Sequence, residues 1–395
     1  MAKILAVNAG SSSLKFQLLN MPEEDVIASG LVERIGFEDA VFNIEFRDQE
    51  RSETVHIPDH AVAVQMLLEV LVDLQIVKSL EDIVGVGHRV VHGGEKFSDS
   101  VKITDEVLKT IEELKDLAPL HNPANATGIR AFEKVLPKVE QVAVFDTAFH
   151  QTMPKESYMY ASPYDWYEKY GVRRYGFHGT SHKYVAERTA QLINKSLEDT
   201  KIITVHIGNG GSLAAVDGGK SVNTSMGFTP LAGLVMGTRT GDIDPSILPF
   251  VMEKENMNID EAISALNKES GLEGVSGISS DMRDIDKGKS EDNERAELAF
   301  DLFVKRVVDY IAAYYVELGG ADAIVFTAGI GENDIEVRKA VMSRLAVLGI
   351  KINEEANNTR GQEIKISTDD SKIQVWVVPT NEEVMIARDT LRLIK

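Results

Sequence analysis

The sequence predicts an α/β protein that folds as two domains. Its 395 residues exceed what a single hydrophobic core usually supports. Short apolar strands that end in small-residue turns alternate with longer amphipathic stretches, which is typical of α/β layers. Two hairpins of the same type also occur far apart in the chain. We therefore expect two domains with a ligand site in the cleft between them.

Three segments have the pattern of a strand followed by a turn of small residues. The first, residues 3–19, contains the turn NAGSSS and is expected to be a hairpin. The second, residues 202–216, contains GNGGS and repeats this order, which suggests a faint internal repeat. The third, residues 323–333, is a strand that runs into the glycine turn AGIGEN, and a helical pattern follows it.

Helical periodicity separates these segments. Capping and stop signals predict helices at residues 61–76, 106–117, 122–136, 182–193, 294–318 and 382–393. Thr180 or Ser181 is the expected cap of the fourth helix. The apolar residues of the fifth predict a buried central helix: Leu298, Leu302, Phe303, Val307, Ile311, Tyr314 and Leu318. The last has one apolar face and should dock on another element, whereas the polar segment 276–293 is expected to be a loop.

The composition excludes several classes of function. The chain has no cysteine, so disulfides, thiolate catalysis and cysteine-ligated metal centres are excluded. The formal net charge of −20 disfavours nucleic acid as a partner, and an anionic substrate needs arginines or lysines set against this charge. No apolar run has the length of a membrane span. The first residues become polar before a signal-peptide core could form, so we expect a cytoplasmic protein.

The glycine-rich turns fit neither common nucleotide motif. A Walker loop ending at Gly219-Lys220-Ser221 would need a glycine at Ala214, and the Rossmann pattern would need one at Leu213 or Asp334. Three strand-exit loops nevertheless favour a phosphate site built from backbone N–H groups, since missing Cβ atoms permit close approach. Five polar residues stand beside tight turns where α/β folds keep their ligands: Arg89, His121, Asp146, His178 and Arg239.

Nine segments, in order and spacing, resemble the acetate kinase family. They are VNAGSSSLKF (7–16), GHRVVHGGEKF (87–97), LHNPAN (120–125), FDTAFH (145–150), YGFHGTSH (175–182), HIGNGGS (206–212), MGTRTGDIDP (236–245), AGIGEN (328–333) and TNEE (380–383). The resemblance implies two similar ribonuclease H-like domains of the actin-like ATPase type. We place the first at 1–150 plus 383–395, closed by the C-terminal helix, and the nucleotide-binding and dimerisation domain at 151–382.

The resemblance also implies an activity, the ATP-dependent and reversible phosphorylation of acetate by direct in-line transfer. Arg89 would hold the carboxylate with His121 nearby, and Arg239 and His178 would contact the transferring phosphoryl group. Asn8 and Glu382 would hold Mg²⁺, for which Mn²⁺ could substitute. The residues implied for ATP are Ser11, Lys15, His206, Ile207, Gly208, Asn209, Gly210, Asp281, Met282, Arg283, Gly329, Ile330, Gly331, Glu332 and Asn333. The implied acyl pocket consists of Val91, Leu120, Phe177 and Pro230.

Asp146 would be a general base in a sugar kinase, but a carboxylate acceptor is already ionised at neutral pH and has no proton to give. We therefore expect Asp146 to position Arg89 or a Mg²⁺-bound water. Two alternatives stay open. The first is a propionate or butyrate kinase with a roomier pocket, and the second is an actin-like ATPase switch that phosphorylates nothing. The family also implies a homodimer.

Overall fold

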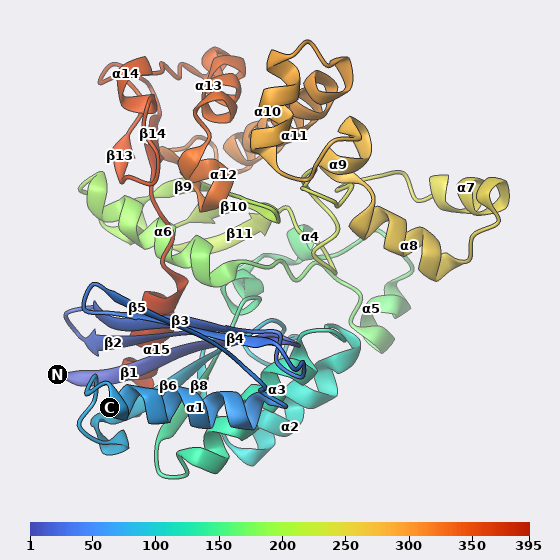
Figure 1. Cartoon of the computed structure of the whole chain (residues 1–395). Coiled ribbons are helices and arrows are strands. Elements are labelled where there is room, and N and C mark those ends of the chain that lie inside the picture. Colours follow the sequence, from blue (N-terminus) through green and yellow to red (C-terminus); the bar gives the residue numbers. More distant parts are fainter. The chain divides into compact units, whose positions relative to one another are not determined.

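A computed structural model describes residues 1–395, and the chain divides into two compact units. Unit 1 consists of Met1–Phe149 and Asn381–Lys395, and unit 2 of His150–Thr380. Each unit contains one β-sheet with helices packed on it, which confirms the predicted α/β class (Figure 1). None of the helices combines the length and apolar composition needed to cross a membrane.

Unit 1 is built on an eight-stranded sheet with the order β5-β4-β3-β2-β1-β6-β8-β7. Its strands are β1 (Ala2–Ala9), β2 (Ser13–Met21), β3 (Asp25–Glu33), β4 (Ala40–Phe46), β5 (Gln49–Val55), β6 (Ile83–Val90), β7 (Val101–Lys102) and β8 (Glu140–Phe145). The first strand pairs antiparallel with β2 and parallel with β6, which in turn pairs parallel with β8. The carboxyl ends of β1, β6 and β8 therefore lie at one edge of the sheet.

Helices cover both faces of this sheet. They are α1 (His60–Asp73), α2 (Asp105–Glu113), α3 (Asn122–Val135) and the C-terminal α15 (Glu382–Ile394). Val86 of β6 shares a buried cluster with the apolar face of α1, and its neighbour Gly87 faces α15 on the other side, because successive strand residues point to opposite faces. A Cβ atom at Gly87 would lie only 2.3 Å from Thr390 Oγ1. Glycine thus lets α15 dock directly on the strand, as the predicted docking of this helix requires.

Unit 2 is built on a six-stranded sheet with the order β11-β10-β9-β12-β14-β13. Its strands are β9 (Lys201–Ile207), β10 (Gly211–Asp217), β11 (Lys220–Thr224), β12 (Ala323–Thr327), β13 (Ile364–Lys365) and β14 (Gln374–Val377). Its helices are α4 (Lys155–Tyr158), α5 (Tyr164–Tyr170), α6 (Gly179–Leu192), α7 (Ile247–Glu255), α8 (Ile259–Lys268), α9 (Gly271–Ser276), α10 (Met282–Ser290), α11 (Glu294–Glu317), α12 (Ala328–Asn333), α13 (Ile335–Arg344) and α14 (Glu354–Asn357).

The two sheets repeat one topology. In unit 2, β9 pairs antiparallel with β10 and parallel with β12, as β1 does with β2 and β6 in unit 1. The next strand along, β14, again pairs parallel with its neighbour β12. The internal repeat suggested by the two hairpins is therefore confirmed at the level of strand order.

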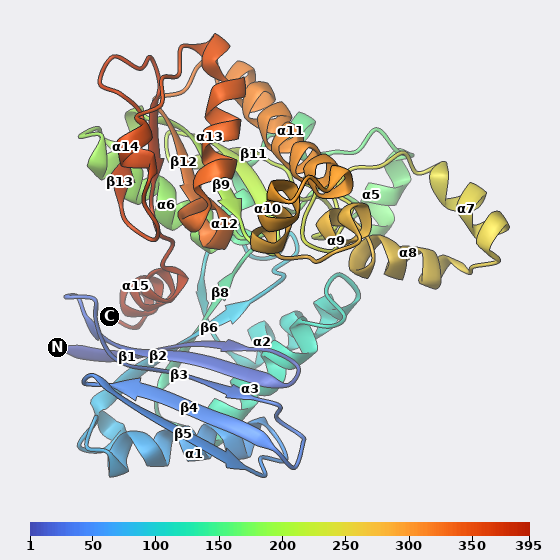
Figure 2. The ribbon, with the colours of Figure 1, turned by 45° about the horizontal axis from the view of Figure 1, so that its top comes forward.

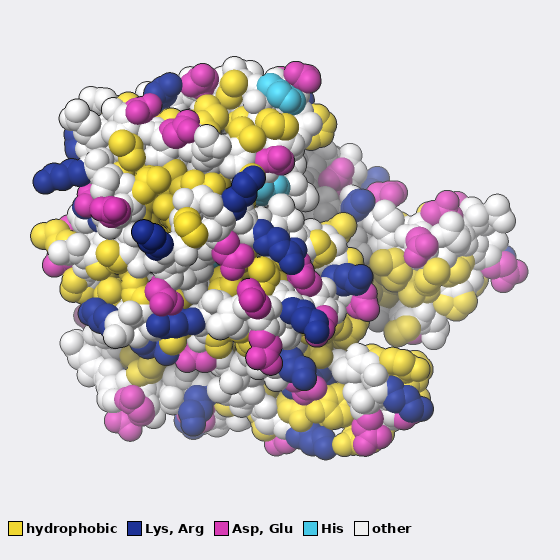
Figure 3. Space-filling model, turned by 90° about the horizontal axis from the view of Figure 1, so that it is seen from below, with side chains coloured by type: hydrophobic (Ala, Val, Ile, Leu, Met, Phe, Trp, Pro, Cys, Tyr) yellow, Lys and Arg dark blue, Asp and Glu magenta, His cyan; other side chains and the backbone are white.

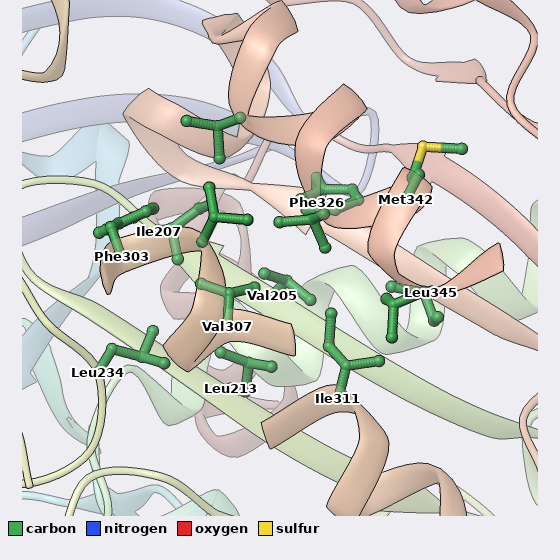
Figure 4. Packing of buried hydrophobic residues seen from close by; sticks show 14 of the residues in the cluster. Val205, Ile207, Leu213, Leu234, Phe303, Val307, Ile311, Phe326, Met342 and Leu345 are labelled. Atoms are coloured by element: carbon green, nitrogen blue, oxygen red, sulfur yellow. The ribbon is translucent and has the colours of Figure 1, made fainter. Parts of the chain in front are cut away.

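The core of unit 2 lies between its sheet and α11, which runs beside α13 (Figure 2). Figure 4 shows Phe303, Val307 and Ile311 of α11 packed over Val205 and Leu213 of the sheet. The predicted central helix is thus confirmed, but two members of its predicted buried set are wrong. Leu298 is 51% exposed and Leu302 is 38% exposed.

Two local predictions fail. The segment expected to be a loop at 276–293 contains α10, which begins after the N-cap Asp281 and buries Met282 and Ile285. The glycines and charged residues of this segment favour a loop in the sequence, but Met282 and Ile285 lie on one buried face of a short amphipathic helix. The expected turn AGIGEN is α12, whose first residue Ala328 has a left-handed φ of 66°. The carboxylate of Glu332 accepts the Ala328 N–H at 2.8 Å and holds this conformation.

Candidate active site

A polar cluster in unit 1 forms around Arg89, which lies near the end of β6. Asp146 follows the adjacent parallel strand β8 and is 1% exposed. Arg89 donates to Asp146 Oδ2 from Nε at 3.0 Å and from Nη2 at 2.5 Å, a charge-assisted fork. Burial disfavours the charged guanidinium, but the nearby carboxylates of Asp146 and Glu382 outweigh it and raise the pKa of Arg89. The guanidinium is therefore a fixed cation at this edge of the sheet.

Asn8 and Glu382, the residues expected to hold Mg²⁺, border the same guanidinium. Arg89 Nη1 donates to Asn8 Oδ1 at 3.4 Å, and Glu382 Oε2 lies 3.9 Å from Arg89 Nε. Removal from water, opposed by Arg89 and reinforced by Asp146, raises the pKa of Glu382 to about 7. Three or more acidic or histidine side chains are nowhere grouped to hold a metal ion. These hard oxygen atoms, with an excess of negative charge, still fit Mg²⁺, which keeps several water and phosphate ligands.

Other residues expected near ligands in unit 1 have varied surroundings. Lys15 forms an ion pair with Glu383 at 2.5 Å, and Ser11 is exposed. Val91 is buried, whereas Leu120 is 76% exposed and His121, beside it at the start of α3, is exposed too. Within unit 1, Leu120 therefore does not join Val91 in an enclosed apolar lining.

In unit 2, His178 lies at the start of α6 and adopts a left-handed φ of 57°. It occupies the N-cap position, so the predicted cap at Thr180 or Ser181 is wrong. Both are buried inside the first turn of α6. The ring of His178 stacks on His206 of β9, with centroids 4.1 Å apart and planes 19° apart. The Nδ1 atom of His178 lies 2.8 Å from Ser212 Oγ, and His206 Nδ1 lies 2.8 Å from Ser181 Oγ.

Arg239 approaches the same place from the loop after β11. A Cβ atom at Gly210 would lie 3.5 Å from Arg239 Nη1 and 3.9 Å from His178 Nε2. Arg239 Nη1 also donates to the Pro230 carbonyl at 3.2 Å, and burial lowers the pKa of Arg239. The Arg239 guanidinium and the His178 imidazole therefore lie beside the glycine loop after β9. Because Gly210 has no side chain, the space between its Cα atom and these two groups is open.

The other loops expected to hold ATP gather around this glycine loop. The Gly237 N–H donates to the Asn209 carbonyl at 3.1 Å, which joins the loop of Arg239 to that of β9. A Cβ atom at Gly208 would lie 3.6 Å from the Gly329 nitrogen, at the start of α12. The side chains of Ile207 and Phe177 are buried. The remaining predicted members lie in α12 and at the start of α10: Ile330, Gly331, Glu332, Asn333, Asp281, Met282 and Arg283.

Asp281 and Arg283 form an ion pair at 2.6 Å, in which Arg283 is 85% exposed. Asn333 Nδ2 donates to the Gly329 carbonyl at 2.9 Å, so this side chain holds its own helix together. Arg89, Asp146, Asn8 and Glu382 thus lie together in unit 1, and His178, Arg239 and the glycine loop after β9 lie together in unit 2.

Several supporting residues were not predicted individually. Asn125 accepts the Val91 N–H and donates to the Ala9 carbonyl, so it ties the ends of β6 and β1 together. In unit 2, Ser212, His182 and Thr204 form a buried series of hydrogen bonds behind His178. Asn125, His182 and Ser212 lie inside the long motifs and could have been found there, whereas Thr204 lies in an apolar strand that gives no signal. A duplicated α/β fold with an anchored arginine in unit 1, and with an arginine and a histidine beside a glycine loop in unit 2, has the features of a phosphotransferase that acts on a small anion.

The comparisons identify which one. A model described as the acetokinase family matches residues 3–388. Acetate kinase of Bacillus velezensis is 59% identical over 393 residues, with 100% of both chains covered. The Bacillus subtilis acetate kinase is 58% identical over 395 residues, also with 100% of both covered. The chain therefore belongs to the acetokinase family.

Solved structures agree with this assignment. The acetate kinase of Porphyromonas gingivalis superposes with a TM-score of 0.97 at 48% identity, covering 100% of both chains. The propionate kinase of Francisella tularensis superposes with a TM-score of 0.93 at 42% identity, also covering 100% of both. The two repeated sheets are the pair of actin-like domains that the sequence motifs implied.

Proposed function

We propose that this protein catalyses the reversible transfer of the terminal phosphoryl group of ATP to acetate, giving acetyl phosphate and ADP. The observation that carries the proposal is the 59% identity to an acetate kinase over the full length of both chains. The geometry of both polar clusters supports it, because phosphoryl transfer needs mainly positioning and neutralisation of charge.

Arg89 binds the carboxylate of acetate in this proposal. Its guanidinium is anchored by the Asp146 fork and is a rigid, permanently charged partner for a planar anion. Acetate is ionised at neutral pH and needs no base, so Asp146 positions Arg89. Val91, Leu120, Phe177 and Pro230 are proposed to contact the methyl group, with His121 nearby.

His178 and Arg239, which both lie close to Gly210, contact the transferring phosphoryl group. Charge develops on the oxygen atoms of this group, so hydrogen-bond donors fixed in advance lower the barrier. The loops at 206–210, 281–283 and 329–333 bind ATP, and Lys15 and Ser11 contact its phosphates. Asn8 and Glu382 would hold Mg²⁺ through water, and the ion neutralises phosphate charge when bound. Mn²⁺ could take its place.

Trapping of the acyl phosphate with hydroxylamine tests the activity. ATP with acetate should give acetohydroxamate in the presence of Mg²⁺, and acetate should stimulate ADP release. ADP release without an acetate-dependent product would instead favour an ATPase switch. Comparing kcat/KM for two-, three- and four-carbon acids tests the propionate or butyrate alternative, since one methylene is worth about 1–3 kcal/mol in an apolar pocket.

We also propose that the protein is a cytoplasmic homodimer formed through unit 2 and that nucleic acid is not a partner. Helices α7 and α8 project from the rest of unit 2, and hydrophobic side chains gather on this segment at the right of Figure 3. The exposed apolar residues of these helices are Ile247, Phe250, Ile259 and Ile263. Patches of this kind commonly bind a second protein surface, and a second copy of the same helices is the proposed occupant.

A further inference from the structure

A series of buried hydrogen bonds leads away from the His178 ring into the sheet of unit 2. Ser212 Oγ lies 2.8 Å from His178 Nδ1 and 2.8 Å from His182 Nε2. His182 Nδ1 lies 2.7 Å from Thr204 Oγ1. Ser212, His182 and Thr204 are each 0% exposed. Strands β9 and β10 and helix α6 thus each supply one member.

The hydrogens in this series are coupled. The hydrogen-bond partners of Ser212 Oγ are these two ring nitrogens, and its single hydrogen points to one of them, so Ser212 donates to one imidazole and accepts from the other. His182 is fully buried and faces the rings of His150, His178 and His206. Burial lowers the pKa of His182 well below its usual value, and electrostatic repulsion from His150 and His206 lowers it further. His182 is therefore neutral and carries a single N–H, so fixing one ring's tautomer fixes the other's.

Thr204 gives the series its direction. Its second acceptor, the Ala214 carbonyl, lies 3.5 Å away, which is too long for an effective hydrogen bond, whereas His182 Nδ1 lies at 2.7 Å. The hydroxyl hydrogen of Thr204 therefore points to His182 Nδ1. His182 then donates from Nε2 to Ser212, and Ser212 donates to His178 Nδ1. The hydrogen of a neutral His178 is consequently on Nε2, which lies 3.9 Å from the point that a Cβ atom of Gly210 would occupy.

We propose that Thr204, His182 and Ser212 are positioning residues that hold His178 in the tautomer and ring orientation in which Nε2–H donates to the transferring phosphoryl group. This inference rests on the proposed contact between His178 and that group. The stacked ring of His206 supports it, because His206 is held at its own Nδ1 by Ser181 and fixes the plane of His178. Arg239 Nη1 lies near the same point beside Gly210 and supplies the positive charge, so a neutral donor at His178 is sufficient.

The main test compares Ser212→Ala with Ser225→Ala. Ser225 is equally buried and its Oγ accepts the Leu213 N–H at 2.9 Å, so both variants lose one buried hydroxyl from the same sheet region. Ser212→Ala should lower kcat by about 10-fold to 100-fold, the usual effect of removing a partner that orients a site histidine. The KM values for ATP and acetate should change little, and Ser212→Thr should restore most of kcat. Thr204→Val should lower kcat in the same way but less.

NMR of protein labelled with ¹⁵N-histidine gives a second readout. The His178 signal, identified by its loss in His178→Gln, should show hydrogen on Nε2 in the wild type and a mixture of tautomers in Ser212→Ala. Equal kcat in Ser212→Ala and Ser225→Ala, or hydrogen on Nδ1 of wild-type His178, would overturn the inference. Full kcat in Thr204→Val would remove Thr204 from it. Full activity of His178→Ala, which has no donor at this position, would instead overturn the proposed role of His178 itself, so the two failures are distinguishable.

Discussion

Replacing Asp146 by asparagine tests whether this buried carboxylate positions Arg89 or acts as a base. Asparagine preserves the shape, but it is neutral and its NH₂ group replaces one carboxylate oxygen, so it cannot keep all the charge-assisted hydrogen bonds that Arg89 donates to Oδ1 and Oδ2. Loss of one charge-assisted hydrogen bond is worth about 1.5–3 kcal/mol. Because 1.4 kcal/mol corresponds to tenfold, kcat/KM for acetate should fall roughly 10-fold to 100-fold.

The assay is steady-state kinetics at several pH values, in water and in deuterium oxide. A positioning role predicts the same proportional loss at every pH from about 6 to 9, far above the ordinary pKa of a carboxyl group. Asp389→Asn is the matched control in unit 1, because Asp389 is also buried and accepts from Ser100 Oγ at 2.6 Å and from Arg392 at 3.1 Å. It should leave the KM for acetate unchanged. A solvent isotope effect on wild-type kcat that disappears in Asp146→Asn would refute the positioning role.

Three further predictions follow from the structure. The folded-state pKa of Glu382 is raised to about 7, so ionising this group costs stability as the pH rises from about 4.5 through 7. Without Mg²⁺, Glu382→Gln should therefore stabilise the protein at pH 8 by about 3 kcal/mol and have little effect at pH 4.5 or below. Urea unfolding that shows no difference between the two pH values would contradict this. Gly210→Ala should fold normally, because its Cβ would meet no atom closer than 3.5 Å, yet it should lower kcat/KM for ATP by placing a methyl group beside Arg239. An unchanged kcat/KM would show that no ligand uses this space. Phe250→Asp should convert the proposed dimer to monomer in light scattering, whereas Val347→Asp, at a position 89% exposed in another part of unit 2, should not.

The strands and the long motifs were readable from the sequence because their signals are local. Apolar runs ending in glycine turns located β1, β9 and β12, and the apolar period located α11 and α15. The exposure of Leu298 and Leu302 was not predictable in this way. An apolar residue on a helix shows that some face is apolar, and only the packing of other elements decides how much of that face is covered.

The candidate site also combines features that local sequence signals predict with features that depend on distant segments. Residue types and turns predicted which side chains carry charge, including Arg89 and Arg239. They did not predict the left-handed backbone at His178 or the hydrogen bonds of Thr204, because both depend on segments that are distant in the sequence and meet only in the folded sheet. Supporting residues of this kind leave no local pattern in an apolar strand.

The docking of α15 on the first sheet has a consequence for synthesis of the chain. Most of unit 1 is made before unit 2, but the strands on which α15 docks lack this helix until residues 382–394 have left the ribosome. Unit 2 is contiguous, and all its elements emerge before α15. We therefore expect unit 2 to complete its folding first. Until α15 docks, the apolar surface of the unit 1 sheet that this helix covers is exposed and can bind chaperones.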